Sequence, residues 1–291
     1  MLISRGDKMH VKDPHARMEE AIRDWSGGFP PGELPKRWER FSDVAILPSG
    51  AFPEAVWGRD DRLWKAVAEA LGAERLARMG EVSGKFRESG LEMLLGDDDW
   101  VVRRENGIDY GYRMTKCMFS AGNVNERRRM GEVVGEGEVV VDMYAGIGYY
   151  TLPALVHGRA SIVHACEWNP EAVMSLGWGL EANRVEERCV VHVGDNAVTT
   201  RSLNGLADRV ILGLLPSSDE GLGSALEVLR PEGGILHVHG LAEPNSYDKW
   251  EEKTRAAVTV ERIGCDIRSS MTRVKSYAPH WDHVVLDLIV A

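Results

Sequence analysis

The sequence of 291 residues predicts an α/β protein built around a doubly wound parallel sheet. From residue 138 onward, apolar strand-like runs alternate with segments of helical length. Alternation of this kind requires parallel strands, with connecting helices that cover both faces of the sheet. The strands are predicted near 139–145, 161–166, 189–194, 208–214, 234–239, 259–267 and 283–290. The helices are predicted near 149–157, 170–183, 220–229 and 246–257.

The last two strands have no predicted helix between them, so the seventh is expected to lie antiparallel beside the sixth. A seven-stranded sheet with an antiparallel last strand is typical of the Rossmann-like, class I methyltransferase fold. The segment that connects the two strands, 268–282, mixes basic and aromatic residues: Arg268, Arg273, Lys275, Tyr277 and Trp281. Composition leaves two interpretations open, a loop that covers a substrate and an irregular hairpin loop.

The first 130 residues predict a smaller α+β domain. Its expected elements are a helix and a loop within 1–40, a strand at 41–47, a helix at 60–72, and a small antiparallel sheet within 91–113 with turns at 96–99 and 105–107. Apolar residues recur at helical spacing over 60–72, and Gly72 is expected to end that helix.

The turn after the first strand of the parallel sheet predicts a nucleoside cofactor. A β-branched run leads into Asp142, and Gly146 and Gly148 follow, so a ligand can lie directly against the backbone. The next strand ends in Glu167, where a carboxylate can accept hydrogen bonds from both hydroxyls of a ribose. The Gly-Ile-Gly pattern lacks the third glycine of a pyrophosphate-binding turn. These details favour S-adenosylmethionine, which has no phosphate, over a dinucleotide.

Residues that follow the third and fourth strands extend the same predicted pocket, because ligands bind beyond the carboxyl ends of parallel strands. Asp195 and Asn196 follow the third strand, where a carboxylate and an amide can bind adenine. The alternative for Asp195 is a helix cap. Residues 214–217 follow the fourth strand and are expected beside the reacting end of the cofactor.

The formal net charge of −10 is unevenly distributed along the chain. Residues 1–130 contain 22 basic and 22 acidic residues, so the whole excess of acid lies in 131–291. Within 113–129, five basic residues face the single acidic residue Glu126; they are Arg113, Lys116, Arg127, Arg128 and Arg129. This basic strip can hold phosphates beside a cofactor site. It can equally be a solvated helix face with ordinary salt bridges, and charge does not decide between the two.

Cysteine usage and hydropathy predict a reduced, cytoplasmic enzyme. The four cysteines form no CxxC pair, no apolar run reaches about 20 residues, and the N-terminus has no apolar signal core. No membrane association and no metal site are expected. His237 and His239 lie on one face of a strand, but no third ligand accompanies them, which favours core packing.

Several blocks of the chain resemble the tRNA wybutosine-synthesizing protein 2 family, especially its eukaryotic members. They include Val-Asp-Met-Tyr-Ala-Gly-Ile-Gly-Tyr-Tyr-Thr at 141–151 and the blocks 116–127, 164–170, 194–196, 208–218 and 234–239. The resemblance begins near Arg37 and reaches the C-terminus. It implies three parts: a poorly matched segment 1–36, a small α+β domain 37–130 and a catalytic domain 131–291.

The resemblance also implies roles for particular residues. Ser120 and Arg127 would hold the methionine portion of S-adenosylmethionine, Glu167 its ribose, and Asp195 and Asn196 its adenine. No catalytic residue is assigned. Glu126 lies where the related tRNA guanine-37 N1-methyltransferases place a residue implicated in proton removal, whereas the nucleophile implied here is a base carbon.

The activity that the resemblance implies is a transfer reaction on RNA. The 3-amino-3-carboxypropyl group of S-adenosylmethionine would move to the tricyclic guanosine at position 37, in the anticodon loop of phenylalanine tRNA, and methylthioadenosine would leave. Leu214-Leu-Pro stands where the N1-methyltransferases have Asn-Leu-Pro, which favours this reaction over methylation. The alternatives are a tRNA guanine-37 N1-methyltransferase and a non-catalytic tRNA-binding protein with a vestigial cofactor pocket.

Overall fold

The computed structural model describes residues 13–82, 84 and 88–291, which form two compact units. The N-terminal unit extends to Val101 and includes Met114–Lys116. The C-terminal unit comprises Val102–Arg113 and Cys117–Ala291. Each unit has its own apolar core, and each is described separately here. The predicted division at residues 36 and 130 stays a prediction.

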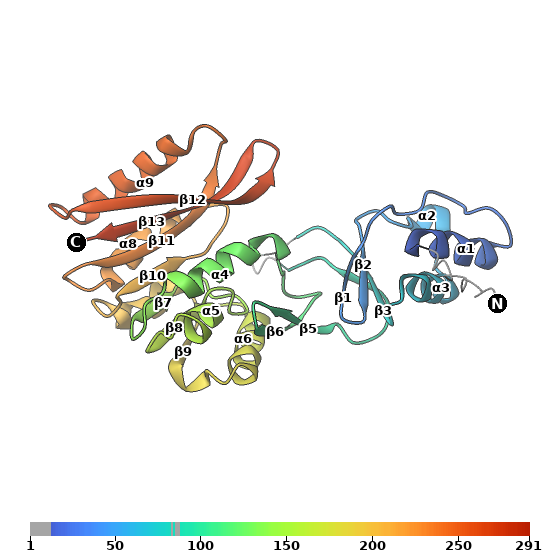
Figure 1. The fold of residues 1–291 in the computed structure, drawn as a ribbon, viewed down its shortest axis with the longest axis horizontal. Helices are drawn as coiled ribbons and strands as arrows, with labels where there is room; N and C mark the ends of the chain where they lie inside the picture. The colour runs from blue at the N-terminus through green and yellow to red at the C-terminus, as the bar shows by residue number, and fades with distance from the viewer. Residues whose placement is uncertain (1–12, 83, 85–87) are drawn as a thin grey trace, which may run out of the picture. The chain divides into compact units, whose positions relative to one another are not determined.

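The N-terminal unit packs three helices on a four-stranded sheet (Figure 1). The helices are α1 (Pro14–Ser26), α2 (Glu54–Trp57) and α3 (Asp61–Leu71), and the sheet order is β1 (Glu39–Phe41), β2 (Val44–Leu47), β3 (Arg75–Arg78) and β4 (Glu92–Leu95). The predicted helix at 60–72 is confirmed, because α3 buries Leu63 and Val67 and ends at Gly72 in the left-handed conformation. The prediction of a smaller N-terminal domain that combines helices and a sheet is therefore confirmed.

Two details of that domain differ from the prediction. The expected single strand at 41–47 is divided into β1 and β2 by a turn in which Ser42 adopts a positive φ of 51°. The small antiparallel sheet expected within 91–113 is not one sheet, although its second turn, between β5 (Trp100–Glu105) and β6 (Ile108–Arg113), is present. β4 pairs antiparallel with β3, while β5 and β6 form a separate two-stranded sheet. Turn residues identify where a strand ends but not which strand it pairs with.

The C-terminal unit contains the predicted seven-stranded sheet. Its strand order is β12 (Ile267–Ala278), β13 (Trp281–Val290), β11 (Gly234–Ala242), β10 (Arg209–Leu212), β7 (Val139–Asp142), β8 (Ile162–Glu167) and β9 (Cys189–Val193). β13 pairs antiparallel with both β11 and β12, and the pairs from β11 to β9 are parallel. The predicted class I fold is confirmed, and the last strand lies between the fifth and the sixth.

The segment 259–282 differs from its prediction. The expected strand at 259–267 is wrong, because α9 (Tyr247–Glu261) continues through the β-branched run and buries Thr254 and Val258, one turn apart. The expected loop at 268–282 is mostly strand, and only Pro279 and His280 separate β12 from β13. β12 is an edge strand with a polar sequence. Its composition therefore resembles that of a loop.

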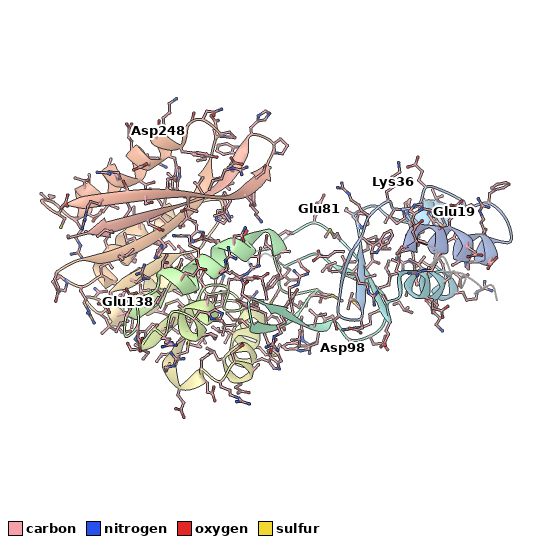
Figure 2. All side chains as sticks on the ribbon, viewed as in Figure 1. Glu19, Lys36, Glu81, Asp98, Glu138 and Asp248 are labelled. Atoms are coloured by element: carbon pink, nitrogen blue, oxygen red, sulfur yellow. The ribbon has the colours of Figure 1, made fainter. Side chains whose placement is uncertain are left out.

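Helices lie against both faces of this sheet. α8 (Leu222–Val228) and α9 form a core with Val210, Leu212 and other apolar residues of the central strands. The remaining helices are α4 (Val124–Val133), α5 (Thr151–Val156), α6 (Pro170–Ala182) and the single turn α7 (Asn196–Thr199). Acidic side chains such as Asp248 of α9 are exposed and point away from the sheet (Figure 2). No helix among the described residues combines the length and apolar character that a membrane span needs.

Candidate cofactor-binding site

The turn after β7 depends on its two glycines. Gly146 and Gly148 have φ angles of +56° and +96°, in the region that favours glycine. A Cβ atom at Gly146 would lie 2.6 Å from the ring of Tyr149, and one at Gly148 would lie 2.8 Å from Leu152 Cγ. At both positions a side chain is therefore disfavoured for two reasons, the backbone conformation and the lack of space.

Asp142 stabilises this turn through hydrogen bonds to residues on both sides of it. Its carboxylate is fully buried and accepts hydrogen bonds from Thr151 Oγ1 at 2.8 Å and from the Tyr144 amide at 3.3 Å. Burial raises the pKa of Asp142 to about 6. The structure therefore assigns Asp142 to the architecture of the turn, because it is enclosed by the protein.

Glu167, at the end of β8, is bonded directly to the glycine turn. One carboxylate oxygen accepts from the Gly146 amide at 2.7 Å, and the other accepts from the amides of Trp168 and Asn169 at 2.9 and 2.8 Å. Burial raises the pKa of Glu167, while these amides favour its ionised form. Three backbone donors fix the carboxylate at the edge of the turn, where the sequence predicts a ribose acceptor.

Asp195 and Asn196 lie on the loop after β9, close to the same turn. The Asn196 side chain donates to the Met143 carbonyl at 2.9 Å, which joins this loop to the one after β7. Asp195 is exposed, and its Oδ1 accepts from the Ala197 amide at 2.9 Å. The helix-cap alternative for Asp195 is therefore confirmed. Asp195 is nevertheless exposed to solvent, so its carboxylate remains accessible to a ligand while it caps the helix.

The structure also brings Ser120 and Arg127 together, in a second cluster. Arg127, on α4, is 1% exposed, and its Nη2 donates to the Ser120 carbonyl at 3.0 Å. The same guanidinium forms a two-pronged ion pair with Glu105 of β5, at 2.5 and 2.8 Å, and lies 4.4 Å from the centre of the Phe119 ring. Its positive charge is thus already matched by Glu105. The sequence contains no pattern that identifies Glu105 or Phe119 as its partners.

Tyr149 connects the two clusters. Its ring packs against Gly146, and its hydroxyl donates to the Met118 carbonyl. Its ring centre also lies 6.0 Å from that of Phe119. The glycine turn and the segment that carries Ser120 are therefore parts of one site.

Glu126 belongs to a buried ion network. Both of its oxygens accept from Arg129, at 2.7 and 2.8 Å, and Arg129 also donates to Asp287 of β13 at 2.6 Å. Glu126 is 2% exposed, and burial raises its pKa. Both oxygens of Glu126 are thus committed to Arg129, and the bond from Arg129 to Asp287 joins α4 to the sheet.

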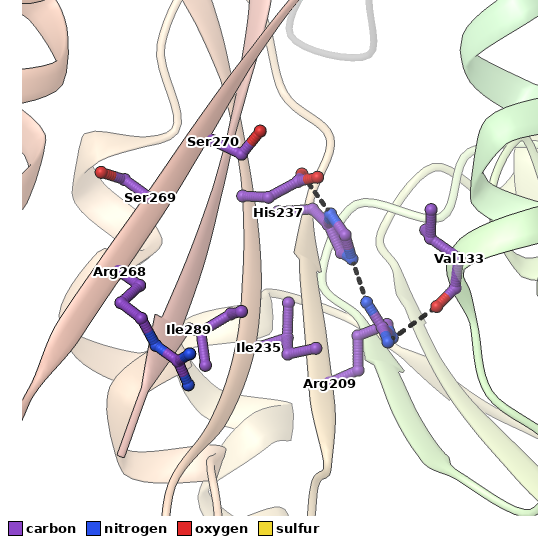
Figure 3. Close-up of a pocket in the computed structure, with 9 residues that line it drawn as sticks. Val133, Arg209, Ile235, His237, Arg268, Ser269, Ser270 and Ile289 are labelled. Atoms are coloured by element: carbon purple, nitrogen blue, oxygen red, sulfur yellow. Dashed lines mark hydrogen bonds and ion pairs between the residues drawn. The ribbon is translucent and has the colours of Figure 1, made fainter.

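The network continues to His237, one of the two histidines considered for a metal. Figure 3 shows Arg209 between the His237 ring and the Val133 carbonyl. Because arginine only donates, His237 Nε2 accepts this bond at 2.6 Å, and Nδ1 donates to Asp287 at 2.6 Å. Burial lowers the pKa of His237, in keeping with the neutral ring.

A cavity of about 230 Å³ lies beside this network. It is lined by Ile235 at the start of β11 and Ile289 at the end of β13. The glycine turn follows the carboxyl end of β7, so the cavity lies toward the opposite end of the strands. No group of three potential metal ligands occurs among the residues that the structure describes.

All five cations of the basic strip have carboxylate partners within 4.0 Å. The pairs are Arg113–Glu171, Lys116–Glu88, Arg127–Glu105, Arg128–Glu132 and Arg129–Glu126. The salt bridges expected for 113–129 are therefore present, but the strip is not one solvated helix face, because Arg127 is 1% exposed and Arg113 belongs to β6. These pairs compensate the positive charge that the strip would need to hold phosphates.

The loop after β10 adds an apolar wall to the site. It begins at Gly213, where a Cβ atom would lie 2.9 Å from the Tyr150 ring, so the loop passes close to the glycine turn. The next residue, Leu214, is half-buried. An apolar side chain therefore occupies the position expected beside the reacting end of the cofactor.

Comparisons with known proteins agree on one group of relatives. A sequence model described as the TRM5/TYW2 methyltransferase domain matches residues 101–267, and one for the TYW2 N-terminal domain matches residues 30–99. The tRNA wybutosine-synthesizing protein 2/3/4 of Arabidopsis thaliana is 44% identical over 301 residues, which cover 97% of this chain and 29% of the plant protein. The tRNA wybutosine-synthesizing protein 2 homolog of Mus musculus is 41% identical over 312 residues, which cover 88% of this chain and 70% of the mouse protein.

A solved structure agrees with these sequence matches. The crystal structure of P. horikoshii TYW2 in complex with MeSAdo has a TM-score of 0.77 and 34% sequence identity to this chain. The similarity covers 94% of this chain and 98% of the archaeal one. The chain thus matches nearly the whole archaeal chain but less than a third of the plant protein.

Proposed function

Because the chain belongs to the tRNA wybutosine-synthesizing protein 2 family, within the wider TRM5/TYW2 methyltransferase-domain family, we propose that it is a transferase of the same kind. It moves the 3-amino-3-carboxypropyl group of S-adenosylmethionine to the tricyclic guanosine at position 37 of phenylalanine tRNA and releases methylthioadenosine. The single observation that carries this proposal is the site after β7, β8 and β9, formed by the glycine turn, Glu167 and Asn196.

The donor groups of this site fit S-adenosylmethionine. The Glu167 carboxylate lies at the rim of the glycine turn and matches the two ribose hydroxyls. The exposed carboxylate of Asp195 and the amide of Asn196 match the amino group and ring nitrogens of adenine. Ser120, together with Arg127, marks the methionine end, which Tyr149 links to the turn. These five assignments are part of the proposal.

Orientation is the main task of the protein in this reaction. When bound, S-adenosylmethionine supplies a sulfonium group with three electrophilic carbons, so the side chains around it select which one faces the base. The transfer would replace the γ-carbon–sulfur bond by a bond to the base carbon, and the proton displaced from that carbon would pass to solvent once the new bond has formed. Alignment and the exclusion of water contribute most to such a step. Half-buried Leu214 supplies an apolar surface for it.

The second candidate, N1-methylation of guanine 37, shares the fold and the RNA. Leucine at position 214 argues against it, because the related methyltransferases have an asparagine there. A binding protein without activity is the third candidate. The glycine turn and the bonded Glu167 argue against that candidate, because a vestigial pocket has no need of either.

We extend the proposal to the partner and the compartment. The anticodon loop of phenylalanine tRNA is the proposed macromolecular partner, and the names of the relatives support a tRNA as substrate. The cytoplasm is the proposed compartment, supported by four cysteines that are all free.

The by-product of the reaction separates the three candidates. The protein is incubated with S-adenosylmethionine and hypomodified phenylalanine tRNA, and the nucleosides are analysed by mass spectrometry. Methylthioadenosine is the expected by-product. S-adenosylhomocysteine would instead indicate methylation, and tight binding of tRNA without turnover would indicate a binding protein.

A further inference from the structure

The methionine end of the site contains a cation that neither the sequence motifs nor the family resemblance assign. Lys275 lies on β12, where it pairs across the strand with His283, near the end of the sheet that carries the site. Its ammonium nitrogen donates to Ser120 Oγ at 2.5 Å. A residue of the sixth strand in the sheet thus contacts the segment just before α4.

The surrounding backbone makes room for this lysine. A Cβ atom at Gly122 would lie 2.9 Å from Lys275 Cδ and 3.3 Å from its nitrogen. The lysine stem therefore lies flat against a glycine, and any larger residue there would displace it. The ammonium group is held in place from two sides, by Ser120 and by the surface of Gly122.

Lys275 differs from Arg127 in how its charge is paired. Arg127 is neutralised by its two-pronged ion pair with Glu105. Within the described part of the chain, no carboxylate lies within 4.0 Å of the Lys275 ammonium group. Burial and the nearby Arg127 lower the pKa of Lys275, as expected for a half-buried ammonium group without an anion beside it. The Lys275 ammonium group is therefore a positive charge without a neighbouring carboxylate, beside the Ser120 hydroxyl.

We propose that Lys275 binds the α-carboxylate of S-adenosylmethionine, with Ser120 as a second donor and Arg127 as a positioning residue. This inference rests on the proposed function, because it places the methionine portion of the cofactor beside Ser120. A carboxylate at this point accepts a charge-assisted hydrogen bond from the ammonium group and supplies the missing anion. Arg127 acts through its bond to the Ser120 carbonyl, which fixes the segment that presents the hydroxyl.

The test compares two ligands that differ only in that carboxylate, S-adenosylmethionine and its decarboxylated form, by isothermal titration. Wild-type protein is expected to prefer S-adenosylmethionine by about tenfold to a hundredfold, the range for a hydrogen bond to a charged group. Lys275→Met should lose most of this preference and bind the decarboxylated ligand as wild type does. Lys275→Arg should retain most of it.

The controls separate failure of this inference from failure of the proposed function. Exposed Lys249 on α9 gives a matched variant, Lys249→Met, which should keep the full preference. Binding of the decarboxylated ligand reports whether each variant has a folded pocket, and Lys275→Gln replaces Lys275→Met if that variant does not fold. The inference would be overturned if Lys275→Met and Lys275→Gln left the preference for S-adenosylmethionine unchanged. It would also be overturned if these variants lost only tRNA affinity, because the lysine would then bind a phosphate of the tRNA. Absence of binding of either ligand to wild type would overturn the proposed function as well.

Discussion

The two ends of the proposed cofactor site, a nucleoside end and a methionine end, are constructed in different ways. The nucleoside end uses backbone groups and short loops, as in the bond from the Gly146 amide to Glu167 and the contact of Asn196 with the Met143 carbonyl. The methionine end uses charged side chains from distant segments, with Glu105 and Lys275 on either side of Ser120 and Arg127. Local chain conformation determines the first end. The second depends on tertiary contacts that bring charged side chains from distant segments together.

The largest effect is expected from Gly146→Val. A valine there would need a φ of +56° and would place its Cβ 2.6 Å from the Tyr149 ring, so the turn must rearrange. Loss of S-adenosylmethionine binding by more than about a thousandfold is expected, on the scale of several kcal/mol for combined strain and overpacking. Calorimetric titration measures it. Affinity close to that of wild type would show that the nucleoside end does not depend on this backbone.

Removal of one charge from the methionine end should act mainly on stability. Arg127→Met leaves Glu105 without its partner, at a site where the arginine side chain is 1% exposed and the glutamate side chain is 13% exposed. Such a loss typically lowers the free energy of unfolding by about 3–5 kcal/mol. Denaturant unfolding of Arg127→Met and of Arg127→Met/Glu105→Leu measures the coupling. The double variant should recover part of the loss, whereas equal stability of the two variants would contradict a dominant Arg127–Glu105 pair.

A smaller effect is expected from Glu167→Ala, which should weaken S-adenosylmethionine binding by about a hundredfold. The change removes the proposed ribose acceptor and leaves the buried Asn169 amide without its carboxylate partner, which together account for about 1–3 kcal/mol; Trp168 is 49% exposed, so water can replace the carboxylate at its amide. Exposed Glu187 supplies the control variant Glu187→Ala. Unchanged affinity of Glu167→Ala would remove this residue from the pocket.

The smallest effect concerns two glycines of α6 that the cofactor site does not use. A Cβ at Gly177 would meet nothing within 4 Å, while one at Gly179 would lie 3.0 Å from Leu152 Cδ1. Gly177→Ala is expected to raise the free energy of unfolding by about 1 kcal/mol, from helix propensity. Gly179→Ala should gain less, because Leu152 must move. A thermal unfolding series in which both variants gain equally would show that space near the turn is not limiting.

The same contrast explains what the sequence predicts and what it does not. The glycine turn, Glu167 and Asn196 are predictable because each follows its own strand, and parallel strands end at a common edge. The contacts of the proposed methionine end are not, because Glu105 lies 22 residues before its partner Arg127 and Lys275 lies 155 residues after its partner Ser120, and neither pair follows a spacing rule. The strand that carries Lys275 was expected as a loop for a related reason, since an edge strand tolerates a polar sequence.

Isotope labelling tests most directly which group of S-adenosylmethionine the protein transfers to the tRNA. Two samples of S-adenosylmethionine, one labelled in the carboxyl carbon and one in the methyl group, are each incubated with the protein and hypomodified phenylalanine tRNA. Carboxyl label should enter the tRNA in equimolar amount with the methylthioadenosine released, and methyl label should remain in that by-product. Methyl label in the tRNA without carboxyl label would contradict aminocarboxypropyl transfer and identify the protein as a methyltransferase.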